Sequence, residues 1–266
     1  MNKVISKDGT EIAYETKGSG KAVILVDGAM CYRNFGPMGH LSDLLAPTFK
    51  VIIFDRRGRG ESTNSRPYAV EREIEDLDAL IQAAGGTAYL YGISSGACLA
   101  LEAAIGLGDK VTRLALYEPP YNSMMDALQQ WKDYRCTLSE LISMHQYGDA
   151  VALFLQFVGT PADQVNGMRQ APMWPMFEAV APTLVFDAAA IGDNRTAPVD
   201  RASTIRVPTL VMDGGANLQY MPFMHASATK LTKVIPHAQQ RTLEGQTHDV
   251  NTEVLAPILL EFFTKQ

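Results

Sequence analysis

The feature that most constrains the fold of this chain is a repeated pairing of a short apolar run with a helical segment. Four such runs occur in the first half of the chain: "KAVILVDG", "KVIIF", "TAYLYGI" and "VTRLALYE". Nearly continuous apolar runs are typical of strands that are buried on both faces of a sheet. Segments with helical patterning follow the first three, near 37–46, 69–84 and 95–106. Strands that alternate with helices predict a parallel sheet with helices on both faces.

The alternation stops at Pro119 and resumes after Ser203 with the apolar run "VPTLVMDGG". The stretch 119–203 has helical patterns broken by prolines, and it holds both tryptophans and six of the 12 methionines. We therefore predict a core formed by 1–118 and 204–266 and a helical cap insert at 119–203. Its apolar residues suit either a packed helical core or a lid over an apolar pocket.

One G-x-S-x-G sequence, "GISSG", lies between a predicted strand and a predicted helix. A serine on such a turn has its hydroxyl raised above the sheet, so we predict that Ser94 is a nucleophile. The backbone N–H of Ser95 then faces the reacting oxygen from a helix N-terminus, where negative charge is favoured. The alternative is a glycine-rich turn in which Ser94 only caps the helix.

A serine nucleophile needs a base, and the chain has five histidines. Of these, only His248 lies in a glycine-containing loop directly after the last predicted strand, in "LEGQTHDVN". That loop belongs at the same edge of the sheet as Ser94, so we predict that His248 is the general base. The alternative is a polar surface residue at the start of the last helix.

Five stretches together resemble the α/β-hydrolase-fold superfamily: "LVDGAM", "FDRRGRGES", "GISSG", "PTLVMDGG" and "LEGQTH". The resemblance covers nearly the whole chain. It implies a mostly parallel, eight-stranded α/β-hydrolase sheet with helices on both faces and a helical cap insert. It also implies a serine–histidine–acid triad and an oxyanion hole.

The resemblance makes Ala29 the second oxyanion-hole donor, because it follows Asp27-Gly28 where many relatives have His-Gly. A carboxylate beside an oxyanion opposes the developing charge. We therefore expect the Asp27 side chain to point away, towards the arginines of "DRRGRGES" (Arg56, Arg57 or Arg59). Those charges are read as structural ion pairs, and Cys31 as a small buried filler.

Most relatives place the acid after strand seven, in a pattern such as G-x-x-D, but here Asn217 stands at that position. An asparagine orients an imidazole without stabilising the imidazolium. We therefore predict that the acid is Glu118, at the end of "VTRLALYE", where the haloalkane dehalogenases place theirs. Asp213 is the runner-up. It also remains open whether Glu118 only caps a backbone N–H, and whether the acid has been lost.

Composition limits the binding partners and the cellular location that we expect for this chain. The chain has a net charge of −6 and no basic stripe, which argues against a nucleic-acid partner. No apolar run approaches the roughly 18 residues of a membrane span, and the first residues lack the apolar region of a signal peptide. Three cysteines without zinc or redox spacing fit a reducing compartment. We expect a cytoplasmic protein that acts on a small molecule without cofactor or metal; the oligomeric state is left open.

Three functions compete. The first is hydrolysis of a small, mainly apolar carboxylic ester or similar carbonyl substrate through Ser94. The second is a cofactor-independent lyase or C–C hydrolase on the same scaffold. The third is a non-catalytic ligand-binding protein. The fold cannot separate them.

Overall fold

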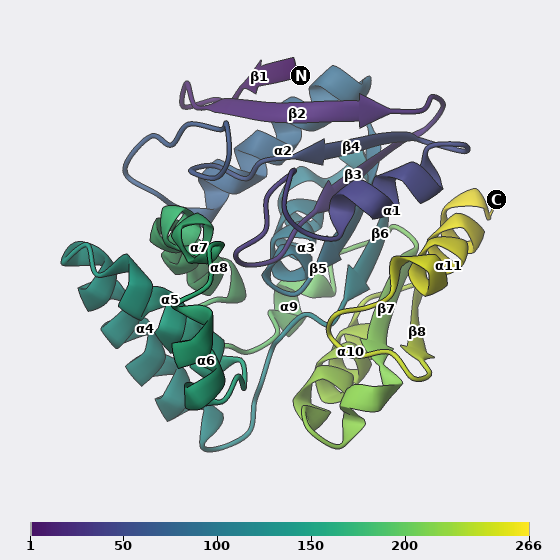
Figure 1. The fold of residues 1–266 in the computed structure, drawn as a ribbon. Coiled ribbons are helices and arrows are strands. Elements are labelled where there is room, and N and C mark those ends of the chain that lie inside the picture. The colour runs from purple at the N-terminus through teal and green to yellow at the C-terminus, as the bar shows by residue number, and fades with distance from the viewer. Residues whose placement is uncertain (1, 266) are drawn as a thin grey trace.

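The computed structural model describes residues 2–265, which form one eight-stranded sheet with helices on both faces (Figure 1). The strands are β1 (Asn2–Ile5), β2 (Glu11–Lys17), β3 (Ala22–Val26), β4 (Lys50–Phe54), β5 (Ala88–Ile93), β6 (Val111–Tyr117), β7 (Thr209–Gly214) and β8 (Ala238–Leu243). Their order is β1-β2-β4-β3-β5-β6-β7-β8. Pairs that involve β2 are antiparallel and all others are parallel. The predicted sheet is confirmed.

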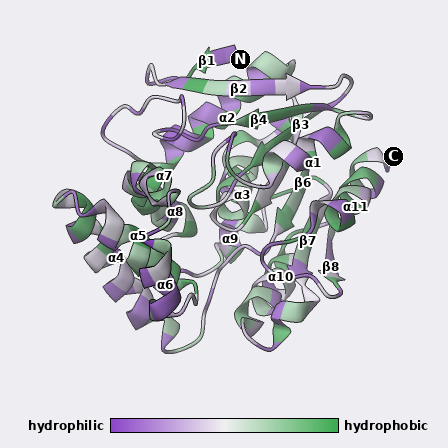
Figure 2. Ribbon diagram, viewed as in Figure 1, coloured by the Kyte–Doolittle hydropathy of each residue, from purple (hydrophilic) through white to green (hydrophobic). Residues whose placement is uncertain are grey.

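Side chains of the central strands alternate between two apolar layers. In β5, Ala88 and Leu90 face one buried cluster, whereas Tyr89 and Tyr91 face the other. Figure 2 accordingly colours the central strands mostly green, for hydrophobic residues. Each large aliphatic side chain buried in this way contributes roughly 1.5–3 kcal/mol to folding.

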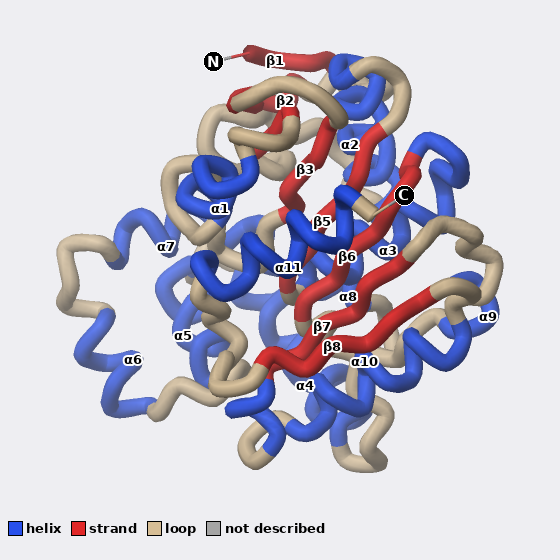
Figure 3. Tube along the Cα trace, turned by 90° about the vertical axis from the view of Figure 1, so that its right-hand side faces the viewer, coloured by secondary structure: helices blue, strands red, loops and turns tan. Residues whose placement is uncertain are grey.

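Five helices of the predicted core cover these two layers, and Ala190 and Ala202 of the predicted cap segment also join the first. The helices α2 (Val70–Ala84), α3 (Ser95–Leu107) and α10 (Pro222–Val234) supply side chains to the first cluster. The helices α1 (Met38–Leu45) and α11 (Thr252–Thr264) supply the second, and α11 crosses in front of the strands in Figure 3. Short 3-10 turns lie at η1 (Gly108–Lys110) and η3 (Gly215–Leu218). The helix ranges predicted from periodicity agree with these bounds to within a few residues.

The predicted cap segment consists of helices and loops between β6 and β7. Its elements are α4 (Ala127–Ser143), α5 (Tyr147–Phe157), α6 (Ala162–Met168), α7 (Trp174–Val180), η2 (Ala181–Thr183), α8 (Leu184–Ile191) and α9 (Val199–Ala202). A third apolar cluster joins Trp131 and Trp174 to Met30 from the loop after β3. The division into core and cap remains a prediction. Within residues 2–265, no helix combines the length and apolar character needed to cross a membrane.

The turn from β5 into α3 depends on close backbone contacts. A Cβ atom on Gly92 would lie 2.4 Å from the carbonyl oxygen of Gly96. One on Gly96 would lie 2.4 Å from the carbonyl oxygens of both Val26 and Asp27. This approach leaves Ser94 between them at φ 57° and ψ −129°, a conformation that L-residues rarely adopt.

We predict that Gly96→Ala lowers the free energy of unfolding by at least about 1–3 kcal/mol, because its methyl group has no room between backbone atoms. Gly106→Ala, in the same helix, is the matched control: its new Cβ would have only Ile74 nearby, at 3.5 Å. The free energy of unfolding of the control should rise by up to about 1 kcal/mol, because alanine has a higher helix propensity than glycine. Urea denaturation measures both, and equal stability of the two variants would contradict the close approach.

Candidate active site

Ser94 lies against the loop that follows β3. A Cβ on Gly28 would be 3.2 Å from the Ser94 Cβ, so this loop directly faces the candidate nucleophile. Ala29 follows Gly28, and Ser95 begins α3. Neither the Ala29 nor the Ser95 backbone N–H donates a hydrogen bond within residues 2–265. Two backbone donors without partners, one on each of the two segments that meet at Ser94, are the groups from which an oxyanion hole can be built.

Glu118 follows β6 directly and is completely buried, in a left-handed conformation with φ 46°. Its Oε2 lies 2.6 Å from His248 Nδ1. Its Oε1 accepts hydrogen bonds from the Gly214 N–H at 2.8 Å and the Asn217 Nδ2 at 2.9 Å. The structure thus brings the predicted acid and the predicted base into direct contact.

Asn217, at the position where most relatives carry the acid, holds the carboxylate of Glu118. Its side-chain amide donates to both carboxylate oxygens, at 2.9 and 3.0 Å. Sequence reasoning considered this asparagine only in the place of the acid, next to the imidazole, and missed its role as a donor to Glu118. The runner-up Asp213 is buried but binds His225 Nδ1 at 2.9 Å and Gln240 Nε2 at 3.0 Å, so the structure does not bring it to His248.

The loop that carries His248 is fixed at its backbone. The Tyr117 hydroxyl donates to the Thr247 carbonyl oxygen at 2.5 Å, and the Ala216 N–H donates to the Gln246 carbonyl oxygen at 3.0 Å. The imidazole is half-buried. Within the described chain, Ser94 Oγ and His248 form no hydrogen bond. Such contacts are often long in hydrolases without substrate and shorten in the complex.

The arginines after β4 are buried in ion pairs, but not with Asp27. Arg56 pairs with Glu73 at 2.7 Å and Asp187 at 2.6 Å, and Arg59 pairs with Asp187 at 2.6 Å. Among the described residues Asp27 forms no ion pair with the three arginines, although Arg59 and Arg56 are near enough to oppose the rise in its pKa. They contact its loop through the backbone instead, because their charges are already matched by acids from α2 and α8. Arg57 pairs separately, with Asp76 and Asp8.

Asp27 is left as a buried carboxyl group without an ion pair. It accepts a hydrogen bond from the Gly28 N–H at 3.1 Å. Burial raises the pKa of Asp27 to about 7, against the opposing effect of that N–H and the more distant Arg59 and Arg56. Burial, with Asp27 beside it, also raises the pKa of the Cys31 thiol, which makes it a poor nucleophile.

Sequence reasoning did not identify Asp187 as the buried partner of Arg56 and Arg59. Asp187 is the single charged residue in the otherwise apolar helix "LVFDAAAI". A lone carboxylate in such a helix indicates a buried partner, since unpaired buried charges are costly. That signal could have linked α8 to the arginine-rich loop.

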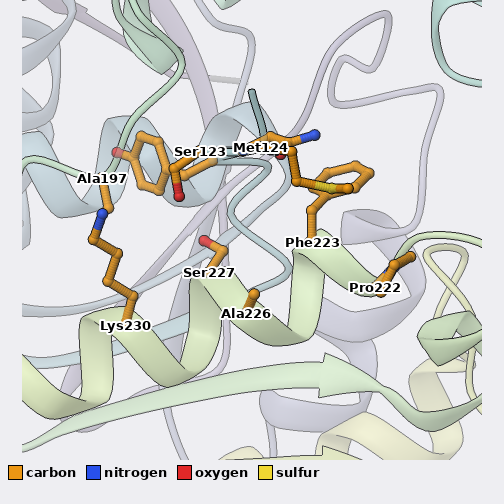
Figure 4. A pocket seen from close by; sticks show the side chains of 10 residues that line it. Ser123, Met124, Ala197, Pro222, Phe223, Ala226, Ser227 and Lys230 are labelled. Carbon is orange, nitrogen blue, oxygen red and sulfur yellow. Dashed lines mark hydrogen bonds between the residues drawn. The ribbon is translucent and has the colours of Figure 1, made fainter. Parts of the chain in front are cut away.

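A cavity of about 230 Å³ lies between the 121–124 segment and α10. Figure 4 shows Met124 and Phe223 side by side at one end and Lys230 at the other. None of the predicted site residues lines it. Within residues 2–265, no cluster of three or more His, Cys, Asp or Glu side chains is arranged to hold a metal ion.

We predict that Asp27→Asn changes the pH dependence of stability. Folded Asp27 keeps its proton up to about pH 7, whereas the unfolded chain loses it near 3.8. The wild type should therefore lose stability between these values as pH rises, by up to about 1.4 kcal/mol per pH unit. The near-isosteric asparagine does not titrate and removes this loss. The free energy of unfolding of the variant should therefore rise relative to that of the wild type from pH 5 to 7. Urea denaturation across that range measures the difference; a constant difference would contradict the raised pKa.

Comparison with known proteins is consistent with this geometry. A family model described as "Alpha/beta hydrolase family" matches residues 23–256. The structure is similar to an alpha/beta hydrolase from Sphaerobacter thermophilus, with 48% sequence identity and a TM-score of 0.87 over 99% of this chain and 100% of that chain.

Two curated proteins are similar over part of their length. They are the uncharacterized hydrolase YraK of Bacillus subtilis, 30% identical over 122 residues, and the proline iminopeptidase PfmaB of Pestalotiopsis fici, 27% identical over 124 residues. Each alignment covers 44% of this chain, and 44% and 43% of the two relatives, so the chain matches less than half the length of either. The family model, by contrast, spans most of the chain and agrees with the fold, and the chain therefore belongs to the alpha/beta hydrolase family.

Proposed function

We propose that this protein is a serine hydrolase that cleaves a small, mainly apolar carboxylic ester or a similar carbonyl substrate. The observation that carries the proposal is the 2.6 Å contact between His248 Nδ1 and the fully buried Glu118 carboxylate. A carboxylate in this position fixes the imidazole tautomer and stabilises the imidazolium that forms during catalysis. The donors on Gly214 and Asn217 keep the carboxylate aimed at the imidazole.

In this mechanism Ser94 Oγ attacks the substrate carbonyl while His248 Nε2 takes the proton from the Ser94 hydroxyl. The backbone N–H groups of Ala29 and Ser95 stabilise the resulting oxyanion. His248 then protonates the departing alcohol, which leaves an acyl group on Ser94. Water, activated by the same imidazole, releases the acid and restores the hydroxyl.

The loop after β3 joins the proposed oxyanion hole to the apolar cap. Met30 belongs to the same buried cluster as the cap tryptophans. Phe35 packs edge-to-face on Phe177 of α7, with ring centroids 5.7 Å apart. An acyl group that extends from Ser94 towards these residues would be enclosed by apolar side chains. This arrangement supports a preference for apolar over charged acyl groups.

We predict that the wild type reacts covalently with a fluorophosphonate probe and that Ser94→Ala does not. A panel of chromogenic esters should show kcat/KM rising roughly fourfold per methylene, because each buried methylene contributes about 0.8 kcal/mol. Since one similar protein is named a proline iminopeptidase, a prolyl arylamide belongs in the panel. Equal labelling of both proteins would remove Ser94 from the mechanism. Labelling without turnover of any ester would favour the lyase or ligand-binding alternatives.

We predict that Glu118→Gln lowers kcat by about 10⁴, the cost of the equivalent exchange in a serine protease. Asp213→Asn is the matched control, since Asp213 is also a buried acid at a strand end but binds His225. It should keep kcat near the wild-type value. Asn217→Asp should lower activity, because a second carboxylate would face Glu118. If Glu118→Gln is unaffected and Asn217→Asp raises activity, the acid has been lost rather than moved.

A further inference from the structure

Asp187 lies at the centre of a buried set of hydrogen bonds that joins α8 to both sides of the proposed oxyanion hole. Its Oδ1 accepts hydrogen bonds from Ser95 Oγ at 2.7 Å and Arg56 Nη1 at 2.6 Å. Its Oδ2 accepts one from Arg59 Nη2 at 2.6 Å. The first of these contacts holds the residue whose backbone N–H is one proposed donor.

Arg59 connects the hydrogen bonds around Asp187 to the second proposed oxyanion-hole donor, the Ala29 N–H. Its Nη1 donates to the carbonyl oxygens of Gly28 at 2.6 Å and Cys31 at 3.0 Å. The Gly28 carbonyl and the Ala29 N–H belong to the same peptide unit. Because that unit is planar and trans, its C=O and N–H point in opposite directions. Fixing the Gly28 carbonyl therefore fixes the direction of the Ala29 N–H, and the bound guanidinium also polarises the peptide.

Arg56 adds a further contact to the same loop, from Nη1 to the Asp27 carbonyl oxygen at 3.3 Å. Its charge is shared between Glu73 and Asp187. Burial alone would raise the pKa of Asp187, but Arg59, Arg56 and the Ser95 hydroxyl outweigh it and hold the pKa below its ordinary value. Asp187 thus stays ionised and keeps both arginines in place.

We propose that Asp187 is a positioning residue for catalysis, which sets the directions of the Ser95 and Ala29 N–H groups through Ser95 Oγ and the Arg59 guanidinium. The inference rests on the proposed function, since it assumes that these two groups bind an oxyanion. A purely structural ion pair between α8 and the core would stabilise the fold but leave the oxyanion hole unchanged. The two roles can be separated by measuring kcat, KM and stability together.

The neighbouring pair of Arg57 and Asp76 is the matched control. It is equally buried, with an N–O distance of 2.7 Å, and it comes from the same loop. Among the contacts of residues 2–265, however, it reaches neither the loop after β3 nor Ser95. Asp76→Asn should therefore cost stability while kcat stays close to the wild-type value.

The test compares Asp187→Asn, Ser95→Ala and Asp76→Asn with the best ester of the panel. Asp187→Asn should lower kcat at least tenfold with little change in KM, because only transition-state binding is lost. Binding of a trifluoromethyl ketone, which forms an oxyanion on Ser94, should weaken by a similar factor, whereas binding of the product acid should not. Ser95→Ala removes one neutral hydroxyl and keeps every ion pair, so it should fold and show a smaller loss of the same kind.

The outcomes are distinct. If Ser94→Ala retains full activity, the proposed function fails. If Ser94 is required but Asp187→Asn loses only stability, as Asp76→Asn should, the positioning role is overturned. If Asp187→Asn does not fold, Ser95→Ala decides: unchanged kcat and unchanged ketone binding would overturn the role, and a selective loss of both would support it.

Discussion

The contact between the first turn of α3 and the end of β3 is the constraint on which the rest of the site depends. Gly96 leaves no space for a side chain between itself and the carbonyl oxygens of Val26 and Asp27. The helix is therefore pressed against the loop that contains Gly28 and Ala29, and the chain must turn sharply at Ser94. A serine hydroxyl and two unpaired N–H groups become neighbours because of a backbone contact, before any catalytic side chain is considered.

The acid of the proposed triad illustrates how one geometry can be reached from two strands. Glu118 comes directly after β6, whereas the family resemblance implies an acid after β7. These strands are adjacent and parallel, so their ends lie at the same edge of the sheet. The position after β7 keeps a polar residue, Asn217, which now donates to the carboxylate instead of carrying it. An asparagine at the expected acid position therefore does not by itself indicate an inactive protein.

The sequence was sufficient for the sheet, the helices and the strand ends at which Ser94 and His248 lie, because continuous apolar runs and turn glycines are local signals. Side-chain partners were harder to predict. Asp27 forms no ion pair with Arg56, because Arg56 is matched by an acid 131 positions away along the chain. Whether Glu118 or Asp213 reaches His248 depends on which way each carboxylate leaves its strand end, which periodicity does not determine. The catalytic roles of all these residues remain predictions.

The burial of Asp187 also limits how the helices above the site can move. Moving α8 away from the sheet would separate the Asp187 carboxylate from two buried guanidinium groups and from Ser95, and would leave that carboxylate without its ion pairs. The helix α8 is thus held in place by buried ion pairs. The helices α4 to α7 contribute apolar side chains to a shared buried cluster, so displacing them would not break these ion pairs. If the proposed site opens to admit a substrate, we therefore expect the outer helices to move while α8 stays in place.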